Sequence, residues 1–195
     1  MSIINPHQKE INCKIVYYGP GLSGKTTSML ALQNKIKSKK RSLAKEISPH
    51  HRTLFFDFLA LSSKQKINQY KVKFQVYTVP GQALYEESRK LLLNGVDGII
   101  FVADSRLEYI EDTLRSMNEL QLNLSKLGYD IHEIPMVIQY NKRDCRTAAR
   151  VDELSKLLNP NGFPEFETVA KKGKGVTESF EKIAQDIILD LKGES

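Results

Sequence analysis

Residues 19–26 read Gly19-Pro20-Gly21-Leu22-Ser23-Gly24-Lys25-Thr26 and fit the pattern G-x-x-x-x-G-K-[ST]. In this pattern small residues let backbone N–H groups surround phosphate oxygens, the lysine reaches the outer phosphates, and the hydroxyl reaches Mg²⁺. The apolar run at residues 12–18 predicts a buried strand, and residues 25–40 predict a helix whose N-terminus faces the anion. We place Thr27, the next residue, in the same phosphate-binding set. A nucleoside triphosphate with Mg²⁺ is therefore the expected ligand.

Strands and helices alternate along the rest of the chain, a pattern typical of an α/β fold with a mostly parallel sheet covered on both faces. Strands are predicted at residues 53–59 and 72–79, and residues 62–69 between them are short for a parallel crossover. We therefore expect one antiparallel edge in a six-stranded sheet. The other predicted elements are a helix at 85–93, a strand at 98–104, a helix with apolar residues at 110, 114, 117, 120 and 124, a strand at 136–140, a helix at 152–158 with Asp152 as its N-cap, a strand at 165–169 and a helix at 177–191.

The composition is that of an ordinary globular protein. The 195 residues are 41% hydrophobic and 27% charged, and we expect a single domain over residues 1–195. No apolar run approaches the roughly 18 residues of a membrane span. The start lacks a signal peptide and a myristoylation glycine, and the end lacks a prenylation cysteine, so no stable membrane anchor is expected. The two cysteines, Cys13 and Cys145, predict reduced thiols in a cytoplasmic protein.

The chain is basic, with a net charge of +6, which would suit a nucleic acid or an anionic membrane. Much of this excess is local, at the end of the first predicted helix, where cations complement the helix dipole. The residues concerned are Lys35, Lys37, Lys39, Lys40 and Arg41. They form either a solvated helix end or a partner-binding patch, and we expect no nucleic-acid partner.

A second motif, Asn141-Lys142-Arg143-Asp144, directly follows the strand predicted at 136–140. Ligands in open α/β sheets bind at the carboxyl ends of the strands. A carboxylate in the plane of a purine can accept hydrogen bonds from both N1–H and the exocyclic amine of guanine, and adenine lacks this pair of donors. Asn141, Lys142 and Asp144 therefore predict guanine as the base, and GTP/GDP with Mg²⁺ as the cofactors.

A third motif, Pro80-Gly81-Gln82, follows the strand at 72–79 and precedes a short helix. Gly81 can bring its N–H to the γ-phosphate, and Gln82 can orient the attacking water. Such positioning is the main contribution of a protein to phosphoryl transfer. The motif therefore predicts a segment that takes part in hydrolysis.

With these motifs in place, the whole sequence resembles the bacterial MglA-type Ras-like GTPases of gliding motility and cell polarity. The blocks that carry the resemblance are residues 11–21 (INCKIVYYGPG), 52–59 (RTLFFDFL), 77–82 (YTVPGQ) and 139–144 (QYNKRD). The resemblance implies a Ras-like P-loop NTPase fold. It also implies that Val169, Ala170 and Lys171 support the guanine, with the N–H at Ala170 meeting the base oxygen.

The resemblance also assigns metal ligands and exposes a departure from Ras. Thr26 and, in the GTP state, Thr53 are the implied Mg²⁺ ligands. Thr78 stands where Ras-like proteins usually carry an aspartate that holds the Mg²⁺ shell, and the MglA-type family shares this threonine. A hydroxyl attracts an Mg²⁺-bound water less strongly than a carboxylate does. Either Asp57, on the neighbouring strand, partly replaces the missing carboxylate, or it has only a structural role.

Arg52 resembles the built-in arginine finger of this family, which would neutralise transition-state charge together with Gln82. From the residues alone, a loop arginine is more often a solvated switch residue, and it is the resemblance that favours the catalytic role. The resemblance further implies a Roadblock-type activating partner similar to MglB, effectors that bind the GTP state, and a cytoplasmic bacterial protein that partners recruit to cell poles or inner-membrane complexes.

The function expected is a GTP-driven switch that controls cell polarity or motility and hydrolyses GTP slowly until a partner arranges Arg52 and Gln82. A nucleotide-locked scaffold with little hydrolysis is the alternative, and the presence of both side chains disfavours it. A P-loop ATPase or kinase is disfavoured by Asp144, because its carboxylate would face adenine without a donor pair.

Overall fold

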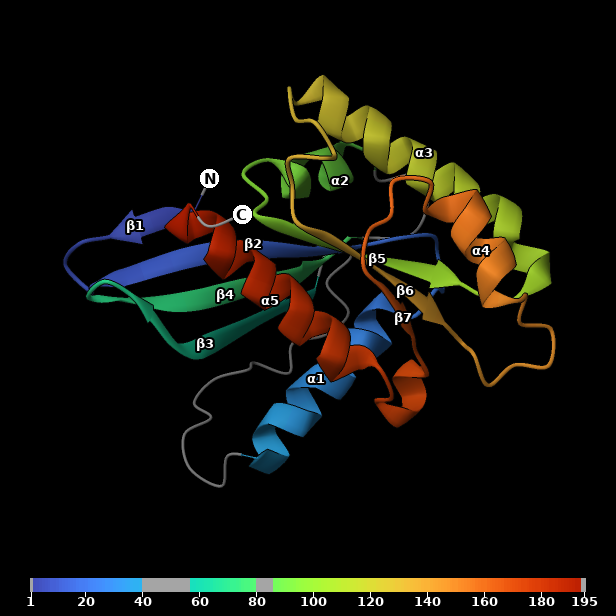
Figure 1. Ribbon diagram of the computed structural model, residues 1–195, viewed down its shortest axis with the longest axis horizontal. Helices are drawn as coiled ribbons and strands as arrows, with labels where there is room; N and C mark the ends of the chain where they lie inside the picture. Colours follow the sequence, from blue (N-terminus) through green and yellow to red (C-terminus); the bar gives the residue numbers. More distant parts are fainter. Residues whose placement is uncertain (1, 40–56, 80–85, 194–195) are drawn as a thin grey trace.

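The computed structural model describes residues 2–39, 57–79 and 86–193, and these residues form one mixed sheet with helices on both faces (Figure 1). The strands follow the order β3-β4-β2-β5-β6-β7, and the short strand β1 pairs with β2 beside this path. The strands are β1 (Ile3–Asn5), β2 (Glu10–Tyr18), β3 (Asp57–Ile67), β4 (Tyr70–Thr78), β5 (Gly98–Asp104), β6 (Met136–Asn141) and β7 (Glu165–Glu167). The α-helices are α1 (Lys25–Lys39), α2 (Glu86–Leu93), α3 (Ile110–Lys126), α4 (Val151–Leu158) and α5 (Val176–Lys192).

The centre of the sheet is parallel, as the sequence predicted. Strand β2 lies between β4 and β5 and pairs in parallel with both, and β5, β6 and β7 continue in the same direction. Every residue of β5 and β6 is buried, which is typical of parallel strands covered on both faces. The carboxyl ends of β2, β5 and β6 therefore share one edge, and Asp104 is paired in register with Asn141 there.

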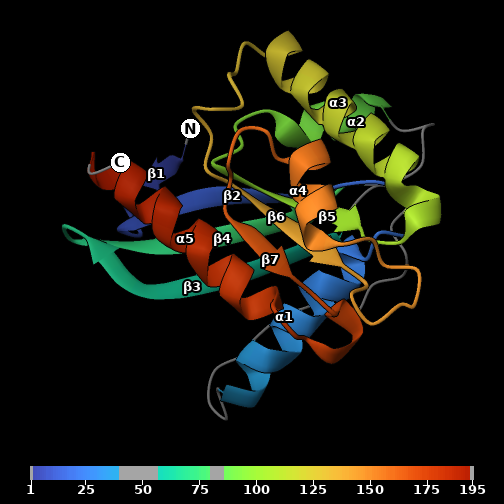
Figure 2. The same cartoon turned by 45° about the vertical axis from the view of Figure 1, so that its right-hand side comes forward.

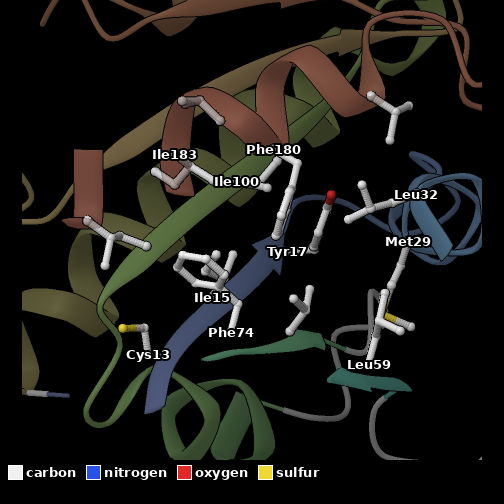
Figure 3. Packing of buried hydrophobic residues seen from close by; sticks show 14 of the residues in the cluster. Cys13, Ile15, Tyr17, Met29, Leu32, Leu59, Phe74, Ile100, Phe180 and Ile183 are labelled. Atoms are coloured by element: carbon white, nitrogen blue, oxygen red, sulfur yellow. The ribbon is translucent and has the colours of Figure 1, made fainter. Parts of the chain in front are cut away.

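Two helical layers cover the sheet, as Figures 1 and 2 show. Helices α1 and α5 pack on one face, where Phe180 and Ile183 of α5 and Met29 and Leu32 of α1 join the apolar side chains of the sheet. Figure 3 shows this packing around Tyr17 of β2. This packing holds α1 against the sheet, and the first residues of α1, Lys25 and Thr26, are also the last residues of the glycine-rich motif.

Helices α2, α3 and α4 cover the other face. The stripe predicted on α3 is core, because Met117, Leu120 and Leu124 are buried and Ile110 and Leu114 pack partly buried against the same cluster. The helix predicted at residues 177–191 is α5, which packs on the first face of the sheet. Four of the apolar residues at 177–191 are buried in the cluster of that face, and two more pack partly buried against it. The buried residues are Phe180, Ile183, Ile187 and Ile188, and the partly buried ones are Ala184 and Leu191.

The antiparallel edge is confirmed, but the extent predicted for its first strand was wrong. Strand β3 runs from Asp57 to Ile67, through polar residues that the sequence assigned to a connection. It pairs antiparallel with β4, and the register of the pairing shifts between Ser62 and Lys66. The actual turn is short, with Asn68 in the left-handed region at φ 53°. An edge strand exposes part of its surface, so polar side chains are tolerated there and hide the strand from a pattern search. Residues 53–56 of the prediction lie outside the described residues.

Three smaller predictions need correction. The sheet gains β1, which pairs with the start of β2 where β5 has not yet begun. Strand β7 ends at Glu167 instead of residue 169, because Val169 bonds back to Lys174 and turns the chain into a 3-10 helix at Ala170–Lys172. Asp152 is not the N-cap of α4, because the cap is Arg150 and the Asp152 carboxylate accepts hydrogen bonds from the Arg150 guanidinium.

Both cysteines are free thiols, and Cys13 is buried, as predicted. Burial raises the pKa of the Cys13 thiol to about 12, so this group stays protonated. Among the described residues, no helix combines the length and the apolar composition that crossing a membrane requires.

Candidate nucleotide-binding site

The glycine-rich loop connects β2 to α1 at the shared edge of the sheet, as the sequence predicted. Gly19 has φ 138° and Gly24 has φ 105°, in a backbone region that disfavours side chains. A Cβ on Gly19 would lie 2.3 Å from the Val102 carbonyl oxygen, and one on Gly24 would lie 2.2 Å from Asn141 Nδ2. The loop backbone thus lies so close to β5 and Asn141 that a side chain does not fit at these two positions, which is consistent with a glycine-rich phosphate-binding loop.

Lys25 is buried at the base of this loop. Its ammonium donates to the carbonyl oxygens of Gly19 at 2.8 Å and Pro20 at 2.7 Å. Burial, and to a lesser extent the charge of Arg89, lowers the pKa of Lys25 to about 7. A lysine has three N–H donors, so a third can reach a phosphate oxygen, and a neighbouring polyphosphate would favour its charged form.

Thr26, Asp57 and Thr78 meet beside the loop. Asp57 Oδ2 accepts hydrogen bonds from Thr26 Oγ1 at 2.6 Å and from Thr78 Oγ1 at 2.8 Å. The Asp57 backbone N–H donates to Thr78 Oγ1 at 3.1 Å, because the two residues are paired across β3 and β4. Two hydroxyls and a carboxylate therefore converge, and oxygen atoms of this kind are the ligands that Mg²⁺ prefers.

Asn141 joins the two ends of the site. Its Nδ2 donates to the Ser23 carbonyl oxygen at 2.7 Å, while its Oδ1 accepts from Thr168 Oγ1 at 3.2 Å and from the Ala170 N–H at 3.0 Å. The glycine-rich loop, the end of β6 and the loop after β7 are thus held by one buried side chain. A base oxygen that binds the Ala170 N–H has to share it with Asn141 or displace Asn141.

The other residues of the base-reading motifs lie around this amide. The Asp144 carboxylate is exposed, and its Oδ2 lies 3.8 Å from the ammonium of Lys172. Val169 is buried, and Lys171 is exposed in the same turn. The structure therefore brings the second motif and the predicted guanine-supporting loop to one place.

The hydrolytic residues cannot be located in the same way. Arg52, Thr53, Gly81 and Gln82 lie outside the described residues, so their roles stay predictions. Asp57 begins β3 and Thr78 ends β4. In the sequence, Arg52 and Thr53 precede β3, and Gly81 and Gln82 follow β4.

Sequence reasoning missed three residues at the base end. Asp104 ends β5 and binds both Lys142 and Arg106, and Arg106 stacks on Tyr109. Burial alone would raise the pKa of Asp104, but the hydrogen bonds from Arg106 and Lys142 outweigh it and hold that pKa below its ordinary value. The position of Asp104 in the sequence could have indicated it, because Asp104 ends an apolar strand just as Asn141 does.

The comparisons with known proteins agree with this geometry. The model of the ADP-ribosylation factor family matches residues 1–187. The chain is 50% identical over 196 residues to the mutual gliding-motility protein MglA of Myxococcus xanthus, covering 98% of each chain. It is 25% identical over 191 residues to the Ypt/Rab-type GTPase ypt7 of Pyricularia oryzae, covering 96% of this chain and 87% of the relative. It is 30% identical over 129 residues to the Ras-related protein Rab-13 of Bos taurus, covering 63% of this chain and 59% of the relative.

The family match spans nearly the whole chain, and the relative in Myxococcus xanthus is similar from end to end. The predicted α/β fold, the guanine nucleotide with Mg²⁺ and the GTPase activity agree with this membership. The chain belongs to the ADP-ribosylation factor family and is a Ras-like small GTPase of the MglA type, a switch that binds GTP and GDP with Mg²⁺ and hydrolyses GTP.

Proposed function

We propose that residues 19–27 and 169–171, together with Asn141, Lys142 and Asp144, form one composite site for a guanine nucleotide in this GTPase. The observation that carries the proposal is a pair of hydrogen bonds at Asn141. Its side chain donates to the Ser23 carbonyl oxygen in the phosphate-binding loop and accepts from the Ala170 N–H in the base-supporting loop. A residue tied to both loops fixes the distance between the phosphates and the base. A nucleotide that spans this distance would engage Lys25 at one end and Asp144 at the other.

At the phosphate end, Thr26 and Asp57 would hold the Mg²⁺, with Thr78 orienting the Asp57 carboxylate. The support is the convergence of two hydroxyls, from Thr26 and Thr78, on one oxygen of the Asp57 carboxylate, Oδ2. When bound, the ion supplies charge neutralisation for the phosphate oxygens. Asp57 thus takes over part of the role of the aspartate that Ras-like proteins carry at the position of Thr78, and Thr53 would join the ligands in the GTP state.

Hydrolysis in this proposal depends on two side chains outside the described residues. Gln82 orients the attacking water, and Arg52 neutralises charge as it develops in the transition state. An arginine in this role contributes on the order of 10³ to 10⁵ in rate. The N–H of Gly81 would contact the γ-phosphate and so report which nucleotide is bound.

The cellular role that we propose is control of polarity or motility by a single GTPase domain over residues 1–195. The support is the 50% identity to a protein named for mutual gliding motility, over 98% of the chain. The switch would bind effectors in its GTP state and a Roadblock-type activator similar to MglB. It would work in the cytoplasm of a bacterium and reach cell poles or inner-membrane complexes through these partners.

The experiment is single-turnover hydrolysis of GTP by the full chain, with and without the Roadblock-type partner. Wild type is compared with Arg52→Ala and Gln82→Leu. We expect stimulated turnover in wild type and a loss of at least about 10³-fold in Arg52→Ala. Near-normal stimulated turnover in Arg52→Ala would reject its assignment, and turnover in wild type that the partner leaves unchanged would favour a nucleotide-locked scaffold.

A further inference from the structure

Two cations share one buried carboxylate behind the base-reading motif. Asp104 is 1% exposed, and its Oδ2 accepts a hydrogen bond from Lys142 Nζ at 2.6 Å. The guanidinium of Arg106 donates to both oxygens of the same carboxylate, from Nε to Oδ1 at 3.0 Å and from Nη2 to Oδ2 at 2.8 Å. Lys142 belongs to the motif that is proposed to bind guanine, whereas Arg106 lies outside all the nucleotide motifs.

The geometry of the Arg106 contact determines where the carboxylate points. A guanidinium that donates to both oxygens fixes the plane of a carboxylate, whereas a lysine ammonium binds it as a point charge and leaves it free to rotate. The backbone N–H of Arg106 also donates to Asp104 Oδ1, at 3.2 Å. With its plane fixed in this way, Asp104 presents Oδ2 in one direction, toward Lys142.

Tyr109 fixes the guanidinium in turn. The Cζ atom of Arg106 lies 3.9 Å from the centre of the Tyr109 ring, and the ammonium of Lys142 lies 5.7 Å from it. Both distances are within the range of cation–π attraction. The ring stands at the start of α3, where the Tyr109 N–H donates to the Arg106 carbonyl oxygen and the Tyr109 carbonyl oxygen accepts from Thr113 Oγ1.

Lys142 needs such an anchor because its backbone is unusual. It has φ 67°, in the left-handed region that a non-glycine residue rarely adopts. The turn that starts there carries Asp144, and its far end is tied to the loop after β5 by two backbone hydrogen bonds. These are from the Leu107 N–H to the Thr147 carbonyl oxygen at 2.8 Å and from the Ala149 N–H to the Ser105 carbonyl oxygen at 2.7 Å.

We propose that Arg106, stacked on Tyr109, is a positioning residue for guanine recognition: it orients Asp104, which holds Lys142 and the turn that carries Asp144. The proposal rests on the proposed role of Asp144 in reading the base. Arg106 acts through other residues and touches no nucleotide. Its removal lets the Asp104 carboxylate rotate, so Asp144 meets the base in a wider range of orientations.

The test compares GDP with inosine diphosphate, which lacks the exocyclic amine that Asp144 is proposed to bind. Release of each nucleotide is measured from the full chain as wild type, Arg106→Met, Arg106→Lys, Tyr109→Leu and Arg115→Met. The last variant is the control, because Arg115 is exposed on α3 and pairs with Asp112. Thermal unfolding of each nucleotide-bound variant shows that it is folded.

We expect Arg106→Met to release GDP roughly tenfold faster and inosine diphosphate less than threefold faster, the scale of one weakened charge-assisted hydrogen bond. Arg106→Lys should recover only part of the difference, because lysine restores the charge without the two-point contact. Tyr109→Leu should shift the ratio of the two rates in the same direction by a smaller factor, and Arg115→Met should match wild type.

Equal acceleration of both nucleotides in Arg106→Met would overturn the proposal, because it would show general loosening of the fold. Full recovery by Arg106→Lys would overturn it as well, since charge alone would then suffice. Asp144→Ala separates this failure from that of the proposed function. If Asp144→Ala leaves the ratio of the GDP release rate to the inosine diphosphate release rate unchanged, the assignment of Asp144 is wrong. If Asp144→Ala raises this ratio and Arg106→Met does not, only the role of Arg106 is wrong.

Discussion

The base end and the phosphate end of the site are held together in different ways. At the base end, polar side chains are fixed by partners from other loops: Asn141 is bonded to Ser23 and Ala170, and Lys142 is bonded to Asp104. These contacts tie together the carboxyl ends of adjacent strands. The base end is therefore held by hydrogen bonds between different loops of the protein.

At the phosphate end, the polar groups bond within one loop or to one shared atom. Lys25 donates to two carbonyl oxygens of its own loop, and Thr26 and Thr78 share a single oxygen of Asp57. A metal ion bound by Thr26 and Asp57 would compete with the hydrogen bonds that these side chains make. We therefore expect substitutions at the base end to change which nucleotide binds and how slowly it is released. Substitutions at the phosphate end should instead change how strongly nucleotide release depends on Mg²⁺.

The largest effect is expected from Asp144→Ala, which removes both acceptors for guanine at the base end. Sites built on such pairing discriminate by about 10⁴ to 10⁵, so the preference for GTP over ATP should fall on the order of 10⁴-fold. Competition of the two nucleotides against a fluorescent GDP measures it. Asp112→Ala, at an exposed ion pair of α3, is the control. A preference that survives Asp144→Ala would mean that the base end does not read the base through this carboxylate.

A smaller effect is expected where the two ends meet, at Gly24. Gly24→Ala places a Cβ 2.2 Å from Asn141 Nδ2, whereas Gly128→Ala, also at a positive φ, meets nothing within 4 Å. Backbone strain should cost each variant about 1 kcal/mol of unfolding free energy. Only Gly24→Ala should also weaken nucleotide binding, by roughly 10²-fold, because it displaces the amide that joins the loops.

Titration calorimetry with GDP, together with chemical denaturation, separates the two contributions. Equal GDP affinity in the two alanine variants would show that Asn141 does not couple the ends of the site.

The smallest effect concerns pH and the base end. The pKa of Asp104 lies below its ordinary value of 3.8 in the folded chain, so the unfolded chain binds the proton more readily. The stabilisation by the ionised carboxylate is therefore complete above the ordinary pKa and is lost as pH falls through the lowered one. Asp104→Asn should cost about 1.5 kcal/mol of unfolding free energy, constant from about pH 8 to about pH 5 and shrinking below about pH 4. Urea denaturation across this range measures it, and a difference that grows toward low pH would contradict the ion network.

Most of the fold could be predicted from the sequence because its signals are local. The loop at residues 19–26 has a strand before it and a helix after it, and the stripes on α3 and α5 have the helical period. The second half of β3 escaped because its polar residues at an exposed edge carry no alternation. Asp152 was misplaced because α4 begins at Val151 with Arg150 as its N-cap, and the Asp152 carboxylate bonds to the Arg150 guanidinium.

The site was predicted in its motifs and not in its supports. Lys25 and Asp144 could be named from the sequence because each belongs to a short motif whose residue types bind a phosphate or a guanine base. Arg106 and Tyr109 act through Asp104, and this relationship exists only after β5 and β6 lie side by side. The contact of Asp57 with Thr26 spans 31 residues, and the sequence could offer a role of Asp57 near the Mg²⁺ only as one of two possibilities.

The difference between the two ends is tested most directly by the effect of Mg²⁺ chelation on GDP release from wild type, Asp57→Asn and Asp104→Asn. Chelation should accelerate release from wild type. In Asp57→Asn the acceleration should largely disappear, because the residue that holds the ion has lost its charge. In Asp104→Asn release should be faster with and without chelator by the same factor. An undiminished response to chelation in Asp57→Asn would contradict the account.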